Sequence, residues 1–206
     1  LYGAGSSLYT VNVNTGAATT VAPLADLMAS IAFSPIDQLF AVNNSGDTLF
    51  RLNPTTGATI ASVPLTGTDI SGEIEGIDFA PDGTLYGIAA GLYHINPSTG
   101  VATRITPAGQ FVGATILNDL DYGADGVLRS FTFQSNSLLY TINPITGLGT
   151  VVGPTGLGID GHGLASVPEP SRLVLAGFGA VGLIVHFCQC RRPRLRPIQS
   201  PEPVGL

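Results

Sequence analysis

One short motif recurs four times along the chain, and this repetition constrains the fold more than any other feature of the sequence. The copies share an aromatic residue near the start and a closing Thr-Gly, and they are LYTVNVNTG from Leu8, LFRLNPTTG from Leu49, LYHINPSTG from Leu92 and LYTINPITG from Leu139. Successive copies begin 41, 43 and 47 residues apart. Self-similarity at a period of about 20–50 residues indicates a repeat architecture.

A second motif alternates with the first. Its copies are IAFSPIDQLFAV from Ile31, IDFAPDGTLYGI from Ile77 and LDYGADGVLRSF from Leu120. Together the two motifs divide each repeat into short strands separated by turns. Four antiparallel strands every 40-odd residues are typical of one β-propeller blade. We therefore predict an all-β fold over residues 1–166, a propeller-like array of about four blades, each a four-stranded antiparallel sheet.

Turn chemistry supports this interpretation. In Pro81-Asp82-Gly83, proline presets φ, aspartate bonds its own backbone and glycine accepts a positive φ. The NPSTG segment at residues 96–100 has the same character, and equivalents recur at 53–57 and 143–147. Because the turn is repeated, we interpret it as structural rather than functional.

The first blade lacks an innermost strand. The chain opens with three strand-like pieces, around residues 1–3, 8–13 and 17–21. Near the other end, residues 160–166 align with the innermost-strand segment 73–79 and have no blade after them. Since propellers close by completing one terminal blade with a strand from the other terminus, we expect residues 160–166 to complete the first blade. The start at Leu1, without methionine or a signal peptide, leads us to expect a longer parent protein.

Charge changes sharply near Val167. The residues before it include three arginines, no lysine and twelve acidic residues, a net charge of −9, whereas those after it carry five arginines and two glutamates, a net of +3. An acidic body without lysine cannot neutralise phosphates, so nucleic acid is not an expected partner. Both cysteines, Cys188 and Cys190, lie after the change, so the body has no disulfide.

Residues 173–190 form an uncharged apolar run of eighteen residues, LVLAGFGAVGLIVHFCQC. At about 1.5 Å per residue, a helix of this length just crosses a hydrocarbon core of about 30 Å. The arginines that follow are Arg191, Arg192, Arg194 and Arg196. A buried helix in a soluble core is the alternative, but such a helix would not be expected to end, uncapped, in a cluster of arginines. Because arginines stay on the cytoplasmic side, we predict a transmembrane helix at 173–190, a cytoplasmic tail at 191–206 and a body outside the cytoplasm.

Just before this run stands an extended, proline-flanked motif made of Val167, Pro168, Glu169 and Pro170, within residues 167–172. The motif, the apolar run and the arginines, in this order, resemble the PEP-CTERM sorting signal of bacterial surface proteins. The resemblance implies export, transient membrane anchoring and processing at the motif by an exosortase. The repeat body, in turn, resembles the YVTN group of propeller-like surface proteins.

Aligning the repeats with one another yields one candidate site. The column ahead of the innermost strand contains Ala29, Glu75, Asn118 and His162. Since innermost strands line the central channel, the last three could converge there, and their types suit a divalent metal. Propellers of the lactonase type are similar in this respect. Ala29 breaks the ring, however, and polar residues in a wet channel need no ligand, so our first interpretation is a solvated channel without a metal.

A second column holds Thr10, Arg51, His94 and Thr141, and we interpret it as a variable, exposed strand position. The sequence contains no GxSxG elbow, P-loop or CxxC pair. We therefore expect no enzymatic activity, no catalytic residue and no cofactor.

These observations lead to one functional hypothesis. We expect an exported protein of the cell envelope, surface or extracellular matrix, whose propeller is a non-enzymatic binding or structural module. Its expected partners are an exosortase-type sorting protease, the membrane, and polysaccharide or surface proteins. The alternative is a metal-dependent lactonase or hydrolase that uses the propeller channel.

Overall fold

The computed structural model describes residues 1–67, 74–108, 110, 112, 117–132 and 137–156. By its contacts the chain divides into two units, Leu1–Val167 and Pro168–Leu206. All described residues belong to the first unit. Their regular secondary structure consists of strands, and no helix occurs in this part of the chain.

Fifteen strands make up the described chain. In order they are β1 (Tyr2–Ala4), β2 (Ser7–Val11), β3 (Ala18–Pro23), β4 (Met28–Phe33), β5 (Leu39–Asn43), β6 (Thr48–Leu52), β7 (Thr59–Pro64), β8 (Gly76–Phe79), β9 (Leu85–Ile88), β10 (Leu92–Ile95), β11 (Ala102–Arg104), β12 (Leu117–Tyr122), β13 (Leu128–Thr132), β14 (Leu138–Ile142) and β15 (Gly149–Pro154).

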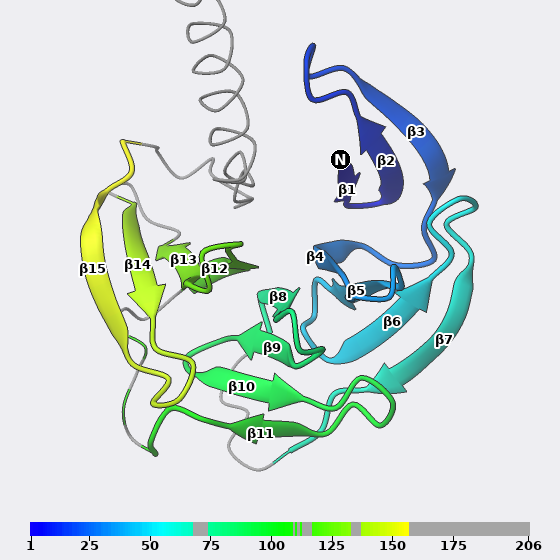
Figure 1. Ribbon diagram of the computed structural model, residues 1–206. Helices are drawn as coiled ribbons and strands as arrows, with labels where there is room; N and C mark the ends of the chain where they lie inside the picture. The colour runs from blue at the N-terminus through cyan, green and yellow to red at the C-terminus, as the bar shows by residue number, and fades with distance from the viewer. Residues whose placement is uncertain (68–73, 109, 111, 113–116, 133–136, 157–206) are drawn as a thin grey trace, which may run out of the picture. The chain divides into compact units, whose positions relative to one another are not determined.

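The strands form four antiparallel sheets, each built from consecutive strands. Blade 1 is β1-β2-β3, blade 2 is β4-β5-β6-β7, blade 3 is β8-β9-β10-β11 and blade 4 is β12-β13-β14-β15. The predicted four-blade propeller is thereby confirmed, and within the described residues blade 1 has three strands. Figure 1 shows β4, β8 and β12 nearest the centre and β3, β7, β11 and β15 on the outside.

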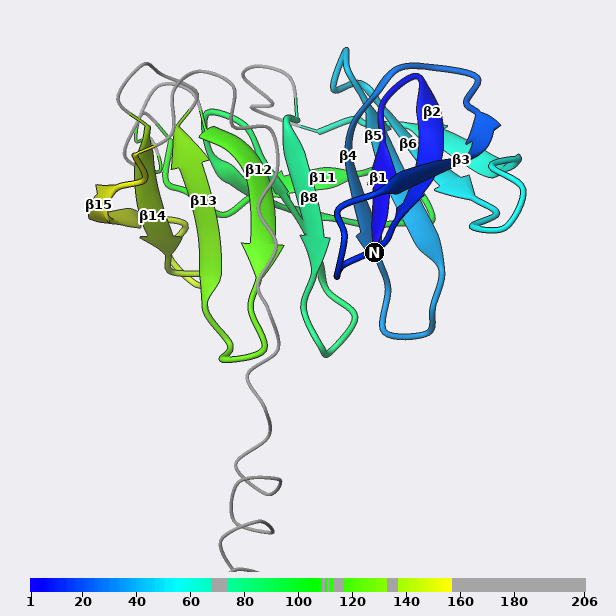
Figure 2. The same cartoon turned by 90° about the horizontal axis from the view of Figure 1, so that it is seen from above.

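The innermost strands of successive blades are neighbours. Contacts join β4 to β8 and β8 to β12. The view in Figure 2 shows β8 and β12 side by side and pointing the same way. Each later strand of a blade lies farther from the centre, so the blades diverge outward (Figure 1).

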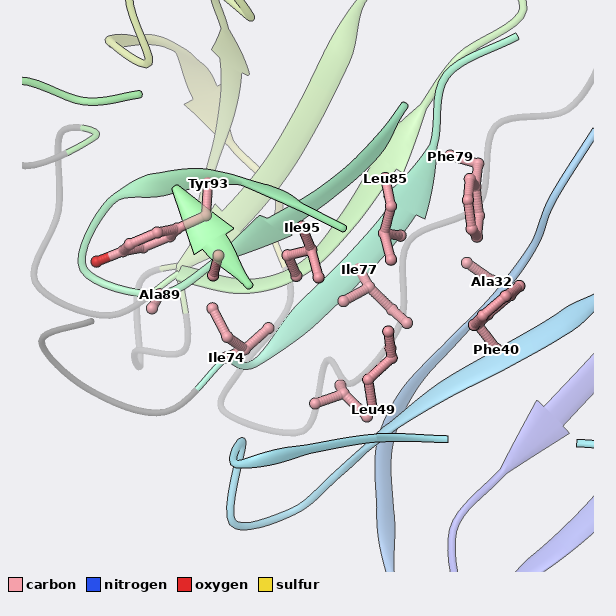
Figure 3. Close-up of a cluster of buried hydrophobic side chains, with 12 residues drawn as sticks. Ala32, Phe40, Leu49, Ile74, Ile77, Phe79, Leu85, Ala89, Tyr93 and Ile95 are labelled. Carbon is pink, nitrogen blue, oxygen red and sulfur yellow. The ribbon is translucent and has the colours of Figure 1, made fainter. Parts of the chain in front are cut away.

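Three apolar cores hold consecutive blades together. Between blades 1 and 2 the buried residues are Leu8, Met28, Leu39, Ala41 and Leu52. The core between blades 2 and 3 contains Ala32, Phe40, Val42, Leu49, Ile74, Ile77, Phe79, Leu85, Ala89, Tyr93, Ile95 and Ala102, most of them labelled in Figure 3. Between blades 3 and 4 it contains Ala80, Tyr86, Ile88, Leu92, Val112, Leu117, Leu120, Leu128, Tyr140 and Ile142. Each fully buried Leu or Ile contributes about 1.5–3 kcal/mol.

Alternation along the strands decides which core receives each side chain. On β6, Leu49 packs into the core between blades 2 and 3, while Leu52 packs into the core between blades 1 and 2. Because successive side chains of a strand point to opposite faces, Arg51 lies on the same face as Leu49. Arg51 therefore faces blade 3.

The repeated NPxTG turns also connect the blades. In the third copy, Oδ1 of Asn96 accepts the backbone N–H groups of Ser98 and Thr99 over 2.9 and 3.2 Å. Gly100 closes the turn with φ of +73° and donates its N–H to the Asn96 carbonyl over 2.8 Å. A Cβ on Gly100 would collide with the carbonyl oxygen of Pro64, the last residue of β7 in blade 2. The turn is thus structural, as predicted, and its glycine is also a contact between blades.

Several sequence predictions fall outside the described residues. They are the closing strand at 160–166, the motif at 167–172, the helix at 173–190 and the tail at 191–206. Within the described chain, no helix is long and apolar enough to cross a bilayer.

Candidate functional site

One buried hydroxyl connects the inner strands of three blades. Ser30 on β4 donates its Oγ–H to Oδ1 of Asp119 on β12 over 3.1 Å. The same oxygen of Ser30 accepts the backbone N–H of Ile77 on β8 over 3.2 Å. Ser30 is only 7% exposed, so these hydrogen bonds are largely shielded from solvent. The propeller centre is therefore crossed by polar contacts between blades 2, 3 and 4.

A β-bulge on β12 places Asp119. The register with β13 shifts between Asn118 and Asp121, and Asp119 has a φ of +45°, which is uncommon for a residue with a side chain. The hydroxyl of Ser130 lies 3.0 and 2.8 Å from the carbonyl oxygens of Asn118 and Asp119 and supports the bulge. The bulge also packs against Gly76, where a Cβ would clash with the Asp119 backbone.

Asp78 on β8 is a half-buried carboxylate that bonds to the innermost strand of the next blade, and its pKa is raised. Its Oδ2 accepts the backbone N–H of Tyr122 on β12 over 2.6 Å, and its Oδ1 accepts that of Phe79 over 2.8 Å. Burial raises the pKa of Asp78 to about 6, the two hydrogen bonds oppose this, and the charges of Asp121 and Asp119 add to it. The carboxylate thus links blades 3 and 4 at a cost in solvation.

The residues of the predicted metal alternative are only partly described. Glu75 directly precedes β8 and donates its backbone N–H to the Ile88 carbonyl over 2.8 Å. Asn118 lies on β12, at the bulge. His162 is outside the described residues. In the ranges that the structure describes, no group of three or more His, Cys, Asp and Glu side chains is arranged to hold a metal ion. The alternative stays a prediction.

A cavity opens between the outer parts of blades 2 and 3. Its volume is about 250 Å³, and it is lined by Gln38, Phe40, Leu49, Phe50, Arg51, Ala61, Ser62, Val63, Pro97 and Ser98. Blade 2 contributes β5, β6 and β7, whereas Pro97 and Ser98 come from the NPSTG turn of blade 3. The register aligns Phe40, Arg51 and Ala61 in one row across the three strands. We refer to this cavity as the blade 2–3 groove.

Arg51 is the charged residue of the groove. It is half-buried, and its Nε is fully buried without a hydrogen-bond partner. No hydrogen bond or ion pair of its guanidinium forms with any other residue in the described part of the chain. By contrast, Arg129 is paired with Asp125. Arg104 has a buried, unpartnered Nε as well, but its Nη2 donates to the Gln110 carbonyl over 2.6 Å.

An apolar cavity of about 280 Å³ adjoins the groove and shares Gln38, Phe40 and Pro97 with it. Its other lining residues are Ser34, Pro35, Ile36, Phe79, Pro81, Asp82 and Gly83. The rings of Phe40 and Phe79 pack with centroids 5.3 Å apart, and Figure 3 shows both at one side of the core between blades 2 and 3. The groove therefore combines one cation with an aromatic and proline surface.

Sequence reasoning treated Arg51 and His94 alike, as members of one exposed column. His94 is indeed exposed, and its ring packs against Tyr86 with centroids 4.9 Å apart. Thr10, Thr141 and Arg51 are half-buried instead. Arg51 also lines the blade 2–3 groove. The prediction was wrong for this residue, since one strand's pattern does not reveal that the Pro97-Ser98 turn of the next blade forms the opposite wall. The available signal was that Arg51 is the only arginine in its column.

Sequence comparison gives a short match to a curated protein. No family model matches the chain. Over 66 residues, 30% of this chain, it is 42% identical to the adipocyte plasma membrane-associated protein of Salmo salar, and the match covers 16% of that protein. The chain thus spans a small part of this curated relative.

Two solved structures have similar folds. The nidogen/laminin complex matches with a TM-score of 0.54 and 13% identity, covering 77% of this chain and 62% of that one. A structural genomics protein of unknown function from Bacteroides thetaiotaomicron also gives a TM-score of 0.54, with 15% identity over 73% of this chain and 44% of the other. The chain spans less than two thirds of each. At such identities the likeness concerns the fold alone.

Proposed function

We propose that this protein is an exported surface or matrix protein whose propeller is a non-enzymatic binding or structural module. The observation that carries the proposal is the order of three elements in the sequence, namely the VPEPS motif, the apolar run at 173–190 and the arginines behind it. Each element has a separate physical role, and only this order suits a sorting signal.

The tail acts in two steps. The apolar run enters the bilayer and stops there because Arg191, Arg192, Arg194 and Arg196 stay in the cytoplasm. The extended stretch around Val167, Pro168, Glu169 and Pro170 then lies just outside the membrane, where an exosortase-type protease can reach it. Cleavage there releases the propeller to the surface or matrix.

The body supports a binding role rather than catalysis. The polar side chains of the inner strands, Ser30, Asp78 and Asp119, are engaged in hydrogen bonds between blades, so their presence has a structural explanation. Grooves between blades offer binding surface instead, and the blade 2–3 groove carries an arginine whose charge is not neutralised within the described chain.

Orientation in the membrane tests the proposal. A reporter that is active only outside the cytoplasm is inserted after Ser166 in one protein and fused after Leu206 in another. We expect activity from the first and none from the second. As a control, alanine at the four arginines of the tail should mix the two orientations. An inactive reporter after Ser166 together with an active one after Leu206 would contradict the proposal.

A further inference from the structure

Arg51 is half-buried, and the N–H donors of its guanidinium have no hydrogen-bond partner in the described chain. Arginine stays charged at any physiological pH and offers five N–H donors in a planar fork. Leaving a buried donor unsatisfied costs free energy, more so for a charged group. The buried Nε of Arg51 carries such a cost in the described chain. The other donors of the guanidinium also have no partner in the described chain, and an acceptor that enters the groove would pair with them.

Further donors face the same space. Gln38, Ser62 and Ser98 line the groove with Arg51. Within the described ranges, none of these three side chains makes a hydrogen bond, although the backbone N–H groups of Gln38 and Ser98 do. One amide and two hydroxyls around a cation form a set that can bind the oxygens of a single anionic group and its neighbours.

The dimensions and charge of the site limit the ligand. A cavity of about 250 Å³ is smaller than a pocket for a drug-sized molecule, which is about 300–1,000 Å³. Phe40 and Pro97 provide an apolar surface beside the cation. The residues before Val167 carry a net charge of −9, which repels polyanions and dianions. One arginine fork neutralises one charge and matches a carboxylate in bidentate geometry.

We propose that the blade 2–3 groove is a binding site for the carboxylate of a compact sugar acid, with Arg51 as the anion contact and Phe40 and Pro97 beside the sugar ring. The proposal deepens the binding role of the propeller and rests on it. The groove lies between strands of blade 2 and the hydrogen-bonded NPSTG turn of blade 3, and the two blades share a packed core, so its shape is set by the fold.

Binding is measured by calorimetry on the full chain, with glucuronate as the probe and glucose as its neutral match. We expect glucuronate to bind and glucose not to bind. Arg51→Thr should raise the Kd for glucuronate about tenfold or more, the loss of one charged hydrogen-bond pair. The variant should fold, because threonine occupies this position of the repeat at Thr10 and Thr141. If it does not fold, Arg51→Lys takes its place and should also weaken binding, since it loses the fork.

Arg129→Thr is the matched control. It removes the same charge from a residue that is paired with Asp125 and does not line the groove. Its Kd should equal that of the parent. Equal losses in both variants would assign the effect to net charge and overturn the proposal. No binding of glucuronate, binding of glucose at the same affinity, or binding of glucose 6-phosphate alone would also overturn it. None of these outcomes bears on the proposal of export and sorting, because the reporter experiment tests that proposal separately.

Discussion

The hydroxyl of Ser30 on β4 donates a 3.1 Å hydrogen bond to Oδ1 of Asp119 on β12, although the two residues are 89 positions apart in the sequence. The bond joins blade 2 to blade 4, and the Ile77 N–H of blade 3 reaches the same hydroxyl oxygen. Apolar cores hold neighbouring blades together, whereas this link extends beyond neighbours. The centre of the propeller is thus defined by specific polar contacts.

Removing this hydroxyl should destabilise the propeller. In Ser30→Ala, the buried N–H of Ile77 and the carboxylate of Asp119 each lose a partner, which we expect to lower the free energy of unfolding by about 1–3 kcal/mol. Urea denaturation of the full chain measures the change. Ser62→Ala, which removes an exposed hydroxyl of β7, should change stability by less than about 0.5 kcal/mol. Equal effects of the two substitutions would refute a special role for Ser30.

Asp78 should make stability depend on pH. Its pKa is about 6 in the folded chain, whereas an aspartate in the unfolded chain has the ordinary pKa of 3.8. Between these values the folded state holds more protons at Asp78, so the contribution of Asp78 to the free energy of unfolding is most favourable below about pH 4 and is lost as the pH rises through 6. The full loss is on the order of 3 kcal/mol. Asp78→Asn should abolish this fall, so the difference between variant and parent should increase in favour of the variant from pH 4 to 7.

Asp125→Asn provides the control for that measurement. Arg129 lowers the pKa of the exposed Asp125 to about 2, so its stabilising effect is complete above about pH 4 and is lost only as the pH falls toward 2. The difference between this variant and the parent should therefore stay constant from pH 4 to 7. Thermal unfolding in a pH series distinguishes the two substitutions. A flat difference for Asp78→Asn as well would show that its carboxylate does not titrate as described.

The turn glycines permit a comparison between equivalent sites. Gly16 and Gly100 both have positive φ, +70° and +73°, and both donate to the asparagine four residues earlier. A Cβ on Gly16 would meet open space, whereas one on Gly100 would meet the Pro64 carbonyl. Gly16→Ala should cost about 1 kcal/mol for the strained backbone, and Gly100→Ala about 1–3 kcal/mol more for the clash between blades. Similar melting temperatures for the two variants would contradict this contact.

Repetition made the fold predictable from the sequence. The turn that begins at Asn96 recurs with the same chemistry at Asn53 and Asn143, so local and global signals agree on the blade pattern. The link between Ser30 and Asp119 was not predictable, because it depends on a bulge that interrupts the two-residue period of β12. The partial burial of Arg51 was not predicted either, because Pro97 and Ser98, which line the groove with it, belong to the next repeat.

Processing of the tail tests the central claim most directly, because a sorted surface protein must be cut near Pro168-Glu169-Pro170. The full chain is expressed in a host with an exosortase, and the size and location of the product are followed by mass spectrometry of the membrane and released fractions. Replacing the three residues by alanine should keep the full-length chain in the membrane. The matched control replaces the second Pro-Glu-Pro, at 201–203, which follows the apolar run and the arginines instead of preceding them, and should be released like the parent. Release of the 168–170 variant at the parent's rate and size would contradict the account.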